Sequence, residues 1–316
     1  MKILFTGASS FTGYWFVREL AAAGHEVTAT LRRPAAEYTD VRRKRVDGIA
    51  GVSRVAIVPG FGSPEFVDLV KQGGFDLLCH HAADVTNYKS ADFNTLEAVA
   101  GNTRNLAAVL SAFSSAGGNG VLLTGSVFEN DEGAGSEGLP AFSPYGLSKA
   151  LTHQMFRYYA HAAKLPLGKF VIPNPFGPFE EPRFTAYLVK NWVAGKTPSV
   201  ETPAYVRDNI HVGLLAKSYA RYAGELFNRC ALPKLNPSGY VESQGAFALR
   251  FAREMKSRLR LPCEVELKVQ TQFAEPRVRI NTDLLDTNAL DWNEAAAWDA
   301  LADYYHQTYA SVAKTK

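Results

Sequence analysis

The stretch TGASSFTG at residues 6–13 joins a short apolar run at the start of the chain to an amphipathic segment. The run KILFTG (2–7) predicts a buried strand, YWFVRELAAAGH (14–25) predicts a helix that ends at Gly24, and EVTATLRR (26–33) predicts a second strand. In such a βαβ unit, the turn after the first strand directs backbone N–H groups and the positive end of the helix dipole toward a phosphate. The stretch therefore predicts a phosphate-binding turn at the start of a parallel sheet.

Two glycines and one serine carry this interpretation. Gly7 allows the tight turn, and Gly13 allows the helix to pack closely. Ser10 stands where a middle glycine is expected, and its small hydroxyl is predicted to donate to a phosphate oxygen. Ser9 and Phe11 complete the predicted contact to a dinucleotide. The alternative is a plain turn that holds no ligand.

Later apolar runs repeat the strand pattern, at residues 55–58, 75–79, 120–124 and 168–172, and helices are expected near 95–113 and 148–163. Continuous apolar strands separated by helices predict a parallel sheet that is covered on both faces. The fold class that we predict is therefore α/β, a Rossmann-type doubly wound sheet with a smaller mixed α/β lobe.

The pattern changes at the proline-rich stretch VIPNPFGPFEEPRF, where the sheet is expected to end. We therefore expect a dinucleotide-binding domain over residues 1–172 and a mainly substrate-binding lobe over residues 173–316, some segments of which can return to the first domain. The second lobe contains predicted helices at 187–195, 244–259 and 293–314.

Composition excludes several classes of protein. The 316 residues carry 34 basic and 31 acidic side chains, a net charge of +3, which is too balanced for a nucleic-acid-binding protein. The basic run VRRKR (41–45) is interpreted as a solvated loop. Cys79, Cys230 and Cys263 are far apart, so neither a disulfide framework nor a metal site is indicated. No apolar stretch approaches the ~18 residues of a membrane span, and we expect a cytoplasmic protein that binds no membrane.

The end of the second predicted strand bears on the cofactor. NAD sites place a carboxylate there for the ribose 2′-hydroxyl, whereas this strand runs into Arg32 and Arg33. Two guanidinium groups suit a 2′-phosphate, so NADP is the preferred cofactor and NAD the alternative. The alternative interpretation is a pair of solvent-facing side chains before Pro34.

Tyr145 is the only tyrosine with a lysine four residues later, Lys149, a spacing that puts both side chains on one helix face. A phenol with a pKa of ~10 needs about 4 kcal/mol of phenolate stabilisation to titrate near neutrality, and one nearby ammonium can supply an effect of that order. Thr124 and Ser126 end a predicted strand at the edge where ligands of such sheets bind. These residues together predict acid–base chemistry at a substrate oxygen.

The chain resembles the extended short-chain dehydrogenase/reductase family, which contains the sugar-nucleotide epimerases, dehydratases and reductases. Five motifs in the family's order carry the resemblance: TGASSFTG, FDLLCHHAADV, SPYGLSK, NPFGP and VRDNIHV. Two departures are Ser10, in place of the middle glycine, and Phe61, in place of an aspartate that contacts the adenine.

The resemblance implies roles for residues at matching positions. Tyr145 would be the general acid or base, Lys149 would bind the nicotinamide ribose and lower the phenol pKa, and Thr124 would hold the substrate hydroxyl. The implied cofactor contacts are Gly7, Ser9, Ser10, Phe11, Gly13, Arg32, Arg33, Ala82, Ala83, Tyr145 and Lys149, and the implied substrate contacts are Ser126, Asn174, Arg207 and Glu275. A homodimer built on the helices near 95–113 and 148–163 is also implied.

Several reactions are compatible with these residues. The 4,6-dehydratases of the family carry an acidic residue where this chain has Ser126, so dehydration is disfavoured. The Arg32-Arg33 pair favours an NADPH-dependent 4-ketosugar reductase acting at C4 of a nucleotide-diphosphate sugar, and a nucleotide-sugar 4-epimerase is the alternative. A reductase of a non-nucleotide carbonyl compound and a non-catalytic NADP-binding protein are the remaining hypotheses.

Overall fold

The computed structural model describes residues 1–135, 140–229 and 233–313. Its main element is a seven-stranded sheet in the order β10-β6-β5-β4-β1-β2-β3, and every pair of neighbouring strands is parallel. The strands are β1 (Lys2–Thr6), β2 (Glu26–Leu31), β3 (Arg54–Ile57), β4 (Leu77–His80), β5 (Gly120–Ser126), β6 (Leu167–Ile172) and β10 (Lys234–Leu235). The prediction of a doubly wound parallel sheet is confirmed.

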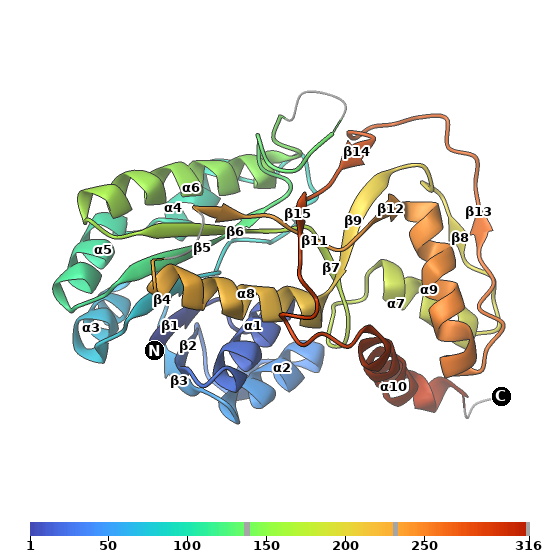
Figure 1. Cartoon of the computed structure of the whole chain (residues 1–316), viewed down its shortest axis with the longest axis horizontal. Coiled ribbons are helices and arrows are strands. Elements are labelled where there is room, and N and C mark those ends of the chain that lie inside the picture. Colours follow the sequence, from blue (N-terminus) through green and yellow to red (C-terminus); the bar gives the residue numbers. More distant parts are fainter. Residues whose placement is uncertain (136–139, 230–232, 314–316) are drawn as a thin grey trace.

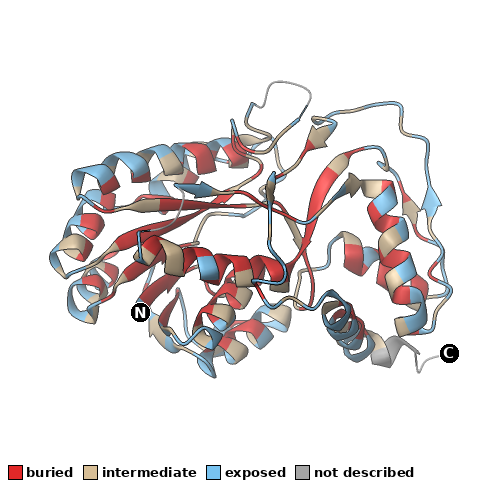
Figure 2. Cartoon of the chain, in the orientation of Figure 1, coloured by how far each residue is buried: buried red, intermediate tan, exposed pale blue. Residues whose placement is uncertain are grey.

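Helices cover both faces of this sheet, which is why its strands read as continuous apolar runs (Figure 1). Ile3 and Phe5 of β1 belong to one core cluster with α1 (Phe11–Ala22), α2 (Asp40–Ala50) and α8 (Val212–Phe227). Leu4 belongs to the opposite cluster with α3 (Pro64–Gly73), α5 (Leu106–Ser115) and α6 (Pro144–Ala162). Figure 2 shows the resulting layers, with buried positions on the strands and on the helix faces turned toward them.

After the proline-rich stretch, β10 returns to pair with β6 and α8 returns to pack on α1, which the expectation for the second lobe allowed. Two other local expectations are wrong. The helix expected near 95–113 is two helices, α4 (Thr95–Asn102) and α5, separated at Asn105, whose φ of 50° lies in the left-handed region. The basic run at 41–45 lies in α2 rather than in a loop, and Arg45 is 0% exposed because its guanidinium donates to Glu181.

The second lobe is built on β9 (Val206–His211), which pairs with β7 (Asn174–Phe176), β12 (Tyr240–Ser243) and β14 (Val278–Arg279). Its helices are α7 (Phe184–Val193), α9 (Gln244–Leu259) and α10 (Glu294–Ala313), which pack together around a separate core cluster (Figure 1). The remaining short elements are η1 (Ala35–Glu37), β8 (Ser199–Val200), β11 (Pro237–Ser238), β13 (Glu266–Leu267) and β15 (Asp283–Leu284). The helices predicted in this lobe are present.

Two further observations concern the predicted classes of protein. Cys79 and Cys263 are buried free thiols, and Cys230 lies outside the described residues. Among the described helices, none has both the length and the apolar character needed to cross a bilayer.

Candidate active site

The turn between β1 and α1 needs both of its glycines. Gly7 has φ +79°, and a Cβ there would lie 2.7 Å from the backbone nitrogen of Ala82. A Cβ on Gly13 would lie 2.3 Å from the carbonyl oxygen of Gly7. Any larger residue at either position would push the turn away from β4 or from the helix, so these glycines set the shape of the loop.

Ser10 is the N-cap of α1. Its Oγ accepts a hydrogen bond from the backbone N–H of Gly13 at 3.1 Å and donates to the carbonyl oxygen of Gly7 at 2.8 Å. The single hydroxyl proton is therefore engaged within the loop, which differs from the predicted donation to a phosphate. The positive end of the α1 dipole still faces the space beyond the loop, so this site can attract an anion without the Ser10 hydroxyl. Phe11 is buried at 4% exposure, and Ser9 is half-buried.

His81, in the motif FDLLCHHAADV, lies at a predicted strand end where packing or a cofactor contact was expected, but it was not among the predicted site residues. It follows β4 directly, and its ring lies between the glycine loop and β5. One ring nitrogen lies 3.1 Å from Ser10 Oγ, and the other lies 3.0 Å from Thr124 Oγ1. Ala82 and Ala83, the next two residues, are half-buried, and the Ala82 backbone N–H donates to Thr6 Oγ1 at 3.1 Å. The end of β4 is thus fixed against the loop.

At the end of β2, Arg32 and Arg33 are both exposed. The guanidinium carbon of Arg33 lies 4.6 Å from the centre of the Tyr38 ring, an arrangement that holds the cation in place. Phe61, by contrast, is 8% exposed, and its ring centre lies 4.2 Å from that of His80. Two exposed guanidinium groups and a helix N-terminus form a donor set that suits the phosphates of a dinucleotide, so NAD(P) fits the residues present.

Tyr145 and Lys149 lie in the first turns of α6, where Pro144 is the first helical residue and Ser143 is the N-cap. The Lys149 ammonium donates to the Thr124 carbonyl oxygen at 2.6 Å. The Tyr145 ring packs edge-on against Tyr88, with ring centres 5.5 Å apart. The start of α6 is therefore held against the end of β5, as the predicted catalytic set requires.

The electrostatics of this pair differ from the prediction. Burial raises the pKa of the Tyr145 phenol above its usual value, and the nearby carboxylate of Glu129 adds to the shift. Burial also lowers the pKa of Lys149 to about 8. The expected lowering of the phenol pKa is absent from this structure, in which the lysine ammonium is turned toward a carbonyl oxygen.

The two hydroxyl candidates at the end of β5 have different environments. Thr124 is 3% exposed, and its hydroxyl faces His81. Ser126 is half-buried, and its Oγ accepts from the backbone N–H of Phe128 at 3.2 Å, which leaves the Ser126 hydroxyl proton able to reach a ligand. The structure thus brings Thr124, Ser126 and Lys149 together at one strand end.

A buried ionic cluster of Glu129, Glu132 and Lys169 lies behind this strand end. The Lys169 ammonium donates to both carboxylates at 2.6 Å, and all three side chains are at most 5% exposed. The other oxygen of Glu129 accepts from the backbone N–H of Ser126 at 2.7 Å. The only sequence signal was a lysine inside the apolar strand β6, with no visible partner. The cluster fixes the loop after β5, including the backbone of Ser126.

The substrate residues predicted in the second lobe fall into two groups. Arg207 donates to the Glu275 carboxylate at 3.0 Å and packs on the Tyr205 ring at 4.5 Å, so Arg207 and Glu275 do lie together. Arg207 is 8% exposed, and Glu275 is the more accessible partner. Asn174 is half-buried on the neighbouring strand β7, in register with Asn209, which is two residues along β9 from Arg207.

Two charged residues near Tyr145 were not predicted as site residues. The guanidinium carbon of Arg183 lies 5.9 Å from the centre of the Tyr88 ring, which itself packs on Tyr145. Glu180 lies 4.0 Å from Arg183, and burial raises the pKa of its carboxyl to about 8. Both residues follow the NPFGP motif, where the Glu180 side chain is buried and Arg183 is exposed. The proline-rich composition there gave no sign of the contacts of Arg183.

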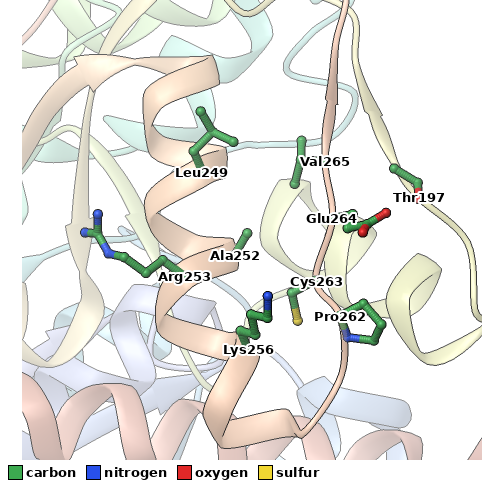
Figure 3. Close-up of a pocket in the computed structure, with 9 residues that line it drawn as sticks. All are labelled: Thr197, Leu249, Ala252, Arg253, Lys256, Pro262, Cys263, Glu264 and Val265. Atoms are coloured by element: carbon green, nitrogen blue, oxygen red, sulfur yellow. The ribbon is translucent and has the colours of Figure 1, made fainter.

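A separate surface pocket lies in the second lobe, between α9 and the chain at residues 262–265 (Figure 3). Lys256 and Cys263 are on its two sides, and no predicted site residue lines it. The described residues also contain no group of three or more His, Cys, Asp or Glu side chains that could hold a metal ion.

Comparison with known proteins gives a family match and several structural matches. Residues 3–225 match the model of the NAD dependent epimerase/dehydratase family. A search of curated protein sequences found no significant match.

Solved structures match over nearly the whole chain. A UDP-glucose 4-epimerase from Thermus thermophilus in complex with NAD is 20% identical, with 97% of this chain and 99% of that chain covered and a TM-score of 0.69. The dTDP-glucose 4,6-dehydratase DesIV from Streptomyces venezuelae is 18% identical, with 98% of each chain covered and a TM-score of 0.69. Pal from Bacillus thuringiensis is 18% identical, with 98% of this chain and 100% of that chain covered and a TM-score of 0.72. These likenesses establish the shared fold.

Proposed function

We propose, from the premise that this chain belongs to the NAD dependent epimerase/dehydratase family, that it is an NAD(P)-dependent oxidoreductase acting at C4 of a nucleotide-diphosphate sugar. The proposal rests on the contact between α6 and β5. Lys149, on the same helix as Tyr145, donates to the backbone carbonyl oxygen of Thr124. A family member with this arrangement can move a proton at a substrate oxygen while the nicotinamide, when bound, supplies or accepts a hydride.

Each residue has a role in this proposal. Tyr145 donates the proton to the substrate oxygen or removes it, and its phenol needs a neighbouring positive charge because burial alone raises its pKa. The charge of Arg183 already lowers the pKa of this phenol, and Lys149, one helical turn away on α6, is the proposed source of further positive charge. Thr124 and Ser126 hold the sugar hydroxyl, and Arg207 holds the diphosphate after exchanging its contact with Glu275. The similarity in fold to a UDP-glucose 4-epimerase and to a dTDP-glucose 4,6-dehydratase supports a nucleotide sugar as the substrate.

NADP is the preferred cofactor in this proposal because Arg33 is held over Tyr38 at the end of β2. Replacing Arg33 with Ala should lower the preference for NADPH over NADH by about tenfold or more, since hydrogen bonds to charged groups contribute about 1.5–3 kcal/mol. The Michaelis constants for both cofactors measure this. Arg221→Ala, on α8 and paired with Glu225, is the control. A wild-type preference for NADH would refute the assignment.

The preferred reaction is reduction of a 4-ketosugar by NADPH, and epimerisation at C4 is the alternative. The enzyme should be incubated with UDP-, GDP-, dTDP- and CDP-linked 4-ketosugars while NADPH absorbance is followed. We expect oxidation with at least one of them, and a loss of about 10²- to 10⁴-fold in kcat for Tyr145→Phe. Interconversion of 4-epimers without NADPH consumption would replace the reductase with the epimerase.

The assembly and location complete the proposal. Leu96 on α4 is 77% exposed, and Leu147 and Tyr158 on α6 are 42% and 69% exposed. These apolar side chains support a homodimer through α4 and α6, which light scattering would contradict if it gave the mass of one chain. The division into a dinucleotide-binding part at 1–172 and a substrate lobe at 173–316, and a cytoplasmic location, are parts of the same proposal.

A further inference from the structure

His81 lies where one side chain can reach two functional segments. It follows β4, which lies between β1 and β5 in the sheet. Its Nε2 lies 3.1 Å from Ser10 Oγ and 3.1 Å from Thr12 Oγ1, both in the loop and first turn that begin α1. Its Nδ1 lies 3.0 Å from Thr124 Oγ1 on β5. The two ends of the imidazole therefore contact the cofactor loop and the substrate hydroxyl site.

The ring is held in this orientation by its neighbours. The Phe5 and Phe16 rings have their centres 5.7 Å and 5.2 Å from that of His81. Burial, together with the smaller effect of the positive charge of Lys149, lowers the pKa of His81 to about 3. The imidazole is thus neutral at physiological pH, with one nitrogen that donates and one that accepts.

The hydrogen bonds of Ser10 determine which nitrogen carries the proton. Ser10 Oγ already donates to the Gly7 carbonyl oxygen and accepts from the Gly13 N–H. The hydrogen between Ser10 and His81 must therefore come from the imidazole, as Nε2–H. Nδ1 is then the acceptor, and the Thr124 hydroxyl donates its proton to it. In this arrangement the Thr124 oxygen keeps a lone pair that can accept from a sugar hydroxyl.

We propose that His81 is a positioning residue that couples the cofactor loop to Thr124. Through Nε2 it braces the first turn of α1 against the end of β4, and through Nδ1 it fixes the direction of the Thr124 hydroxyl. The part of this inference that concerns Thr124 rests on the proposed function, whereas the part that concerns the loop requires only that the cofactor binds. His81 acts through Ser10, Thr12 and Thr124 and does not itself exchange a proton with the substrate.

Three substitutions separate the two contacts. His81→Asn keeps a polar atom at the position of Nδ1, His81→Gln keeps one at the position of Nε2, and His81→Phe keeps only the packing between Phe5 and Phe16. The dissociation constant of NADPH, measured by fluorescence titration, should rise about three- to tenfold in His81→Phe and His81→Asn. In His81→Gln it should stay within about twofold of the wild-type value.

Turnover should show the opposite pattern. With a nucleotide sugar that the enzyme accepts, kcat should fall about tenfold or more in His81→Phe and His81→Gln, and His81→Asn should recover most of it. The KM for the nucleotide sugar should change less than kcat, since the diphosphate contacts are untouched. In a Thr124→Val background, His81→Asn should lose its advantage over His81→Phe.

The pattern across the variants decides the inference. It is overturned if His81→Phe matches the wild type in NADPH affinity, or if the Asn and Gln variants change affinity equally. If the wild type binds NADPH but turns over no nucleotide sugar, the proposed function fails, and the affinities of the three variants still confirm or overturn the role of His81. Melting curves of the cofactor-free variants identify any that have lost the fold. If His81→Phe is one of them, His81→Asn and His81→Gln are compared with each other and with the wild type.

Discussion

The loop at residues 6–13 is held by neutral hydrogen bonds, both between near neighbours and to His81, whereas the region behind the end of β5 is held by charged side chains from distant segments. In the loop, Ser10 bonds to Gly7 and Gly13, three residues away on either side. Behind β5, Lys169 binds carboxylates 37 and 40 residues away. The conformation of the cofactor loop therefore depends on close packing around its glycines, whereas the region behind β5 depends on the balance of buried charges. The two regions should respond differently to substitution.

The largest effect is expected on the charged side. Lys169→Met removes the cation between Glu129 and Glu132 and leaves two buried carboxylates with less compensation. Breaking a buried ion pair in this way typically costs about 3–5 kcal/mol of unfolding free energy. Urea denaturation measures the free energy of unfolding. The control is Lys71→Met, which removes a lysine that is 58% exposed and should change stability by less than about 1 kcal/mol. A loss below ~1 kcal/mol for Lys169→Met would contradict the dependence on charge.

A smaller effect is expected in the loop, where one added methyl group is enough to displace the backbone of the turn. Gly13→Ala places a Cβ 2.3 Å from the Gly7 carbonyl oxygen, so the turn must shift. Overpacking of this kind costs about 1–3 kcal/mol, and NADPH affinity should fall with it. Gly101→Ala on α4 is the matched control because nothing lies within 4 Å of its added Cβ. Equal NADPH affinities for the two variants would show that the loop is not shape-limited.

The third effect is a pH dependence in the second lobe, which is spread over several pH units. The pKa of Glu180 is raised to about 8 by burial, so the folded state holds this proton more tightly than the unfolded chain does. Stability should therefore fall as pH rises from about 4.5 to about 8, by up to ~1.4 kcal/mol per pH unit for one group. Denaturation curves across this range measure the slope.

The control for this slope is substitution of the group itself. Glu180→Gln should flatten the dependence, whereas Glu26→Gln, at an exposed position on β2, should leave it unchanged. A slope that persists in Glu180→Gln would assign the titration to another residue.

The same contrast explains what could be predicted from the sequence. Gly7, Gly13 and the strands on either side of the loop follow from local patterns, because their spacing and hydrophobicity act within a few residues. The break at Asn105 and the two-residue strand β10 left no such pattern: one depends on a single left-handed residue, and the other on pairing with β6.

The charged contacts were missed for a different reason. Arg45 belongs to a basic run that is typical of a solvated loop, yet it is buried because it donates to Glu181, 136 residues away. Lys169 in an apolar strand was the only hint of its cluster. A charged residue is usually exposed, but it can be buried when the fold brings an oppositely charged partner close to it. A single sequence does not show which distant residue that partner is.

Redox chemistry at C4 of a nucleotide-linked sugar, at the site formed by α6 and β5, can be followed in a single-turnover reaction with NADPH deuterated at the transferred position and a 4-ketosugar nucleotide. The product is analysed by mass spectrometry and NMR. We expect deuterium at C4 of the sugar with the wild type and almost none with Tyr145→Phe. Bound cofactor and bound nucleotide sugar with no deuterium transferred by the wild-type protein would contradict it.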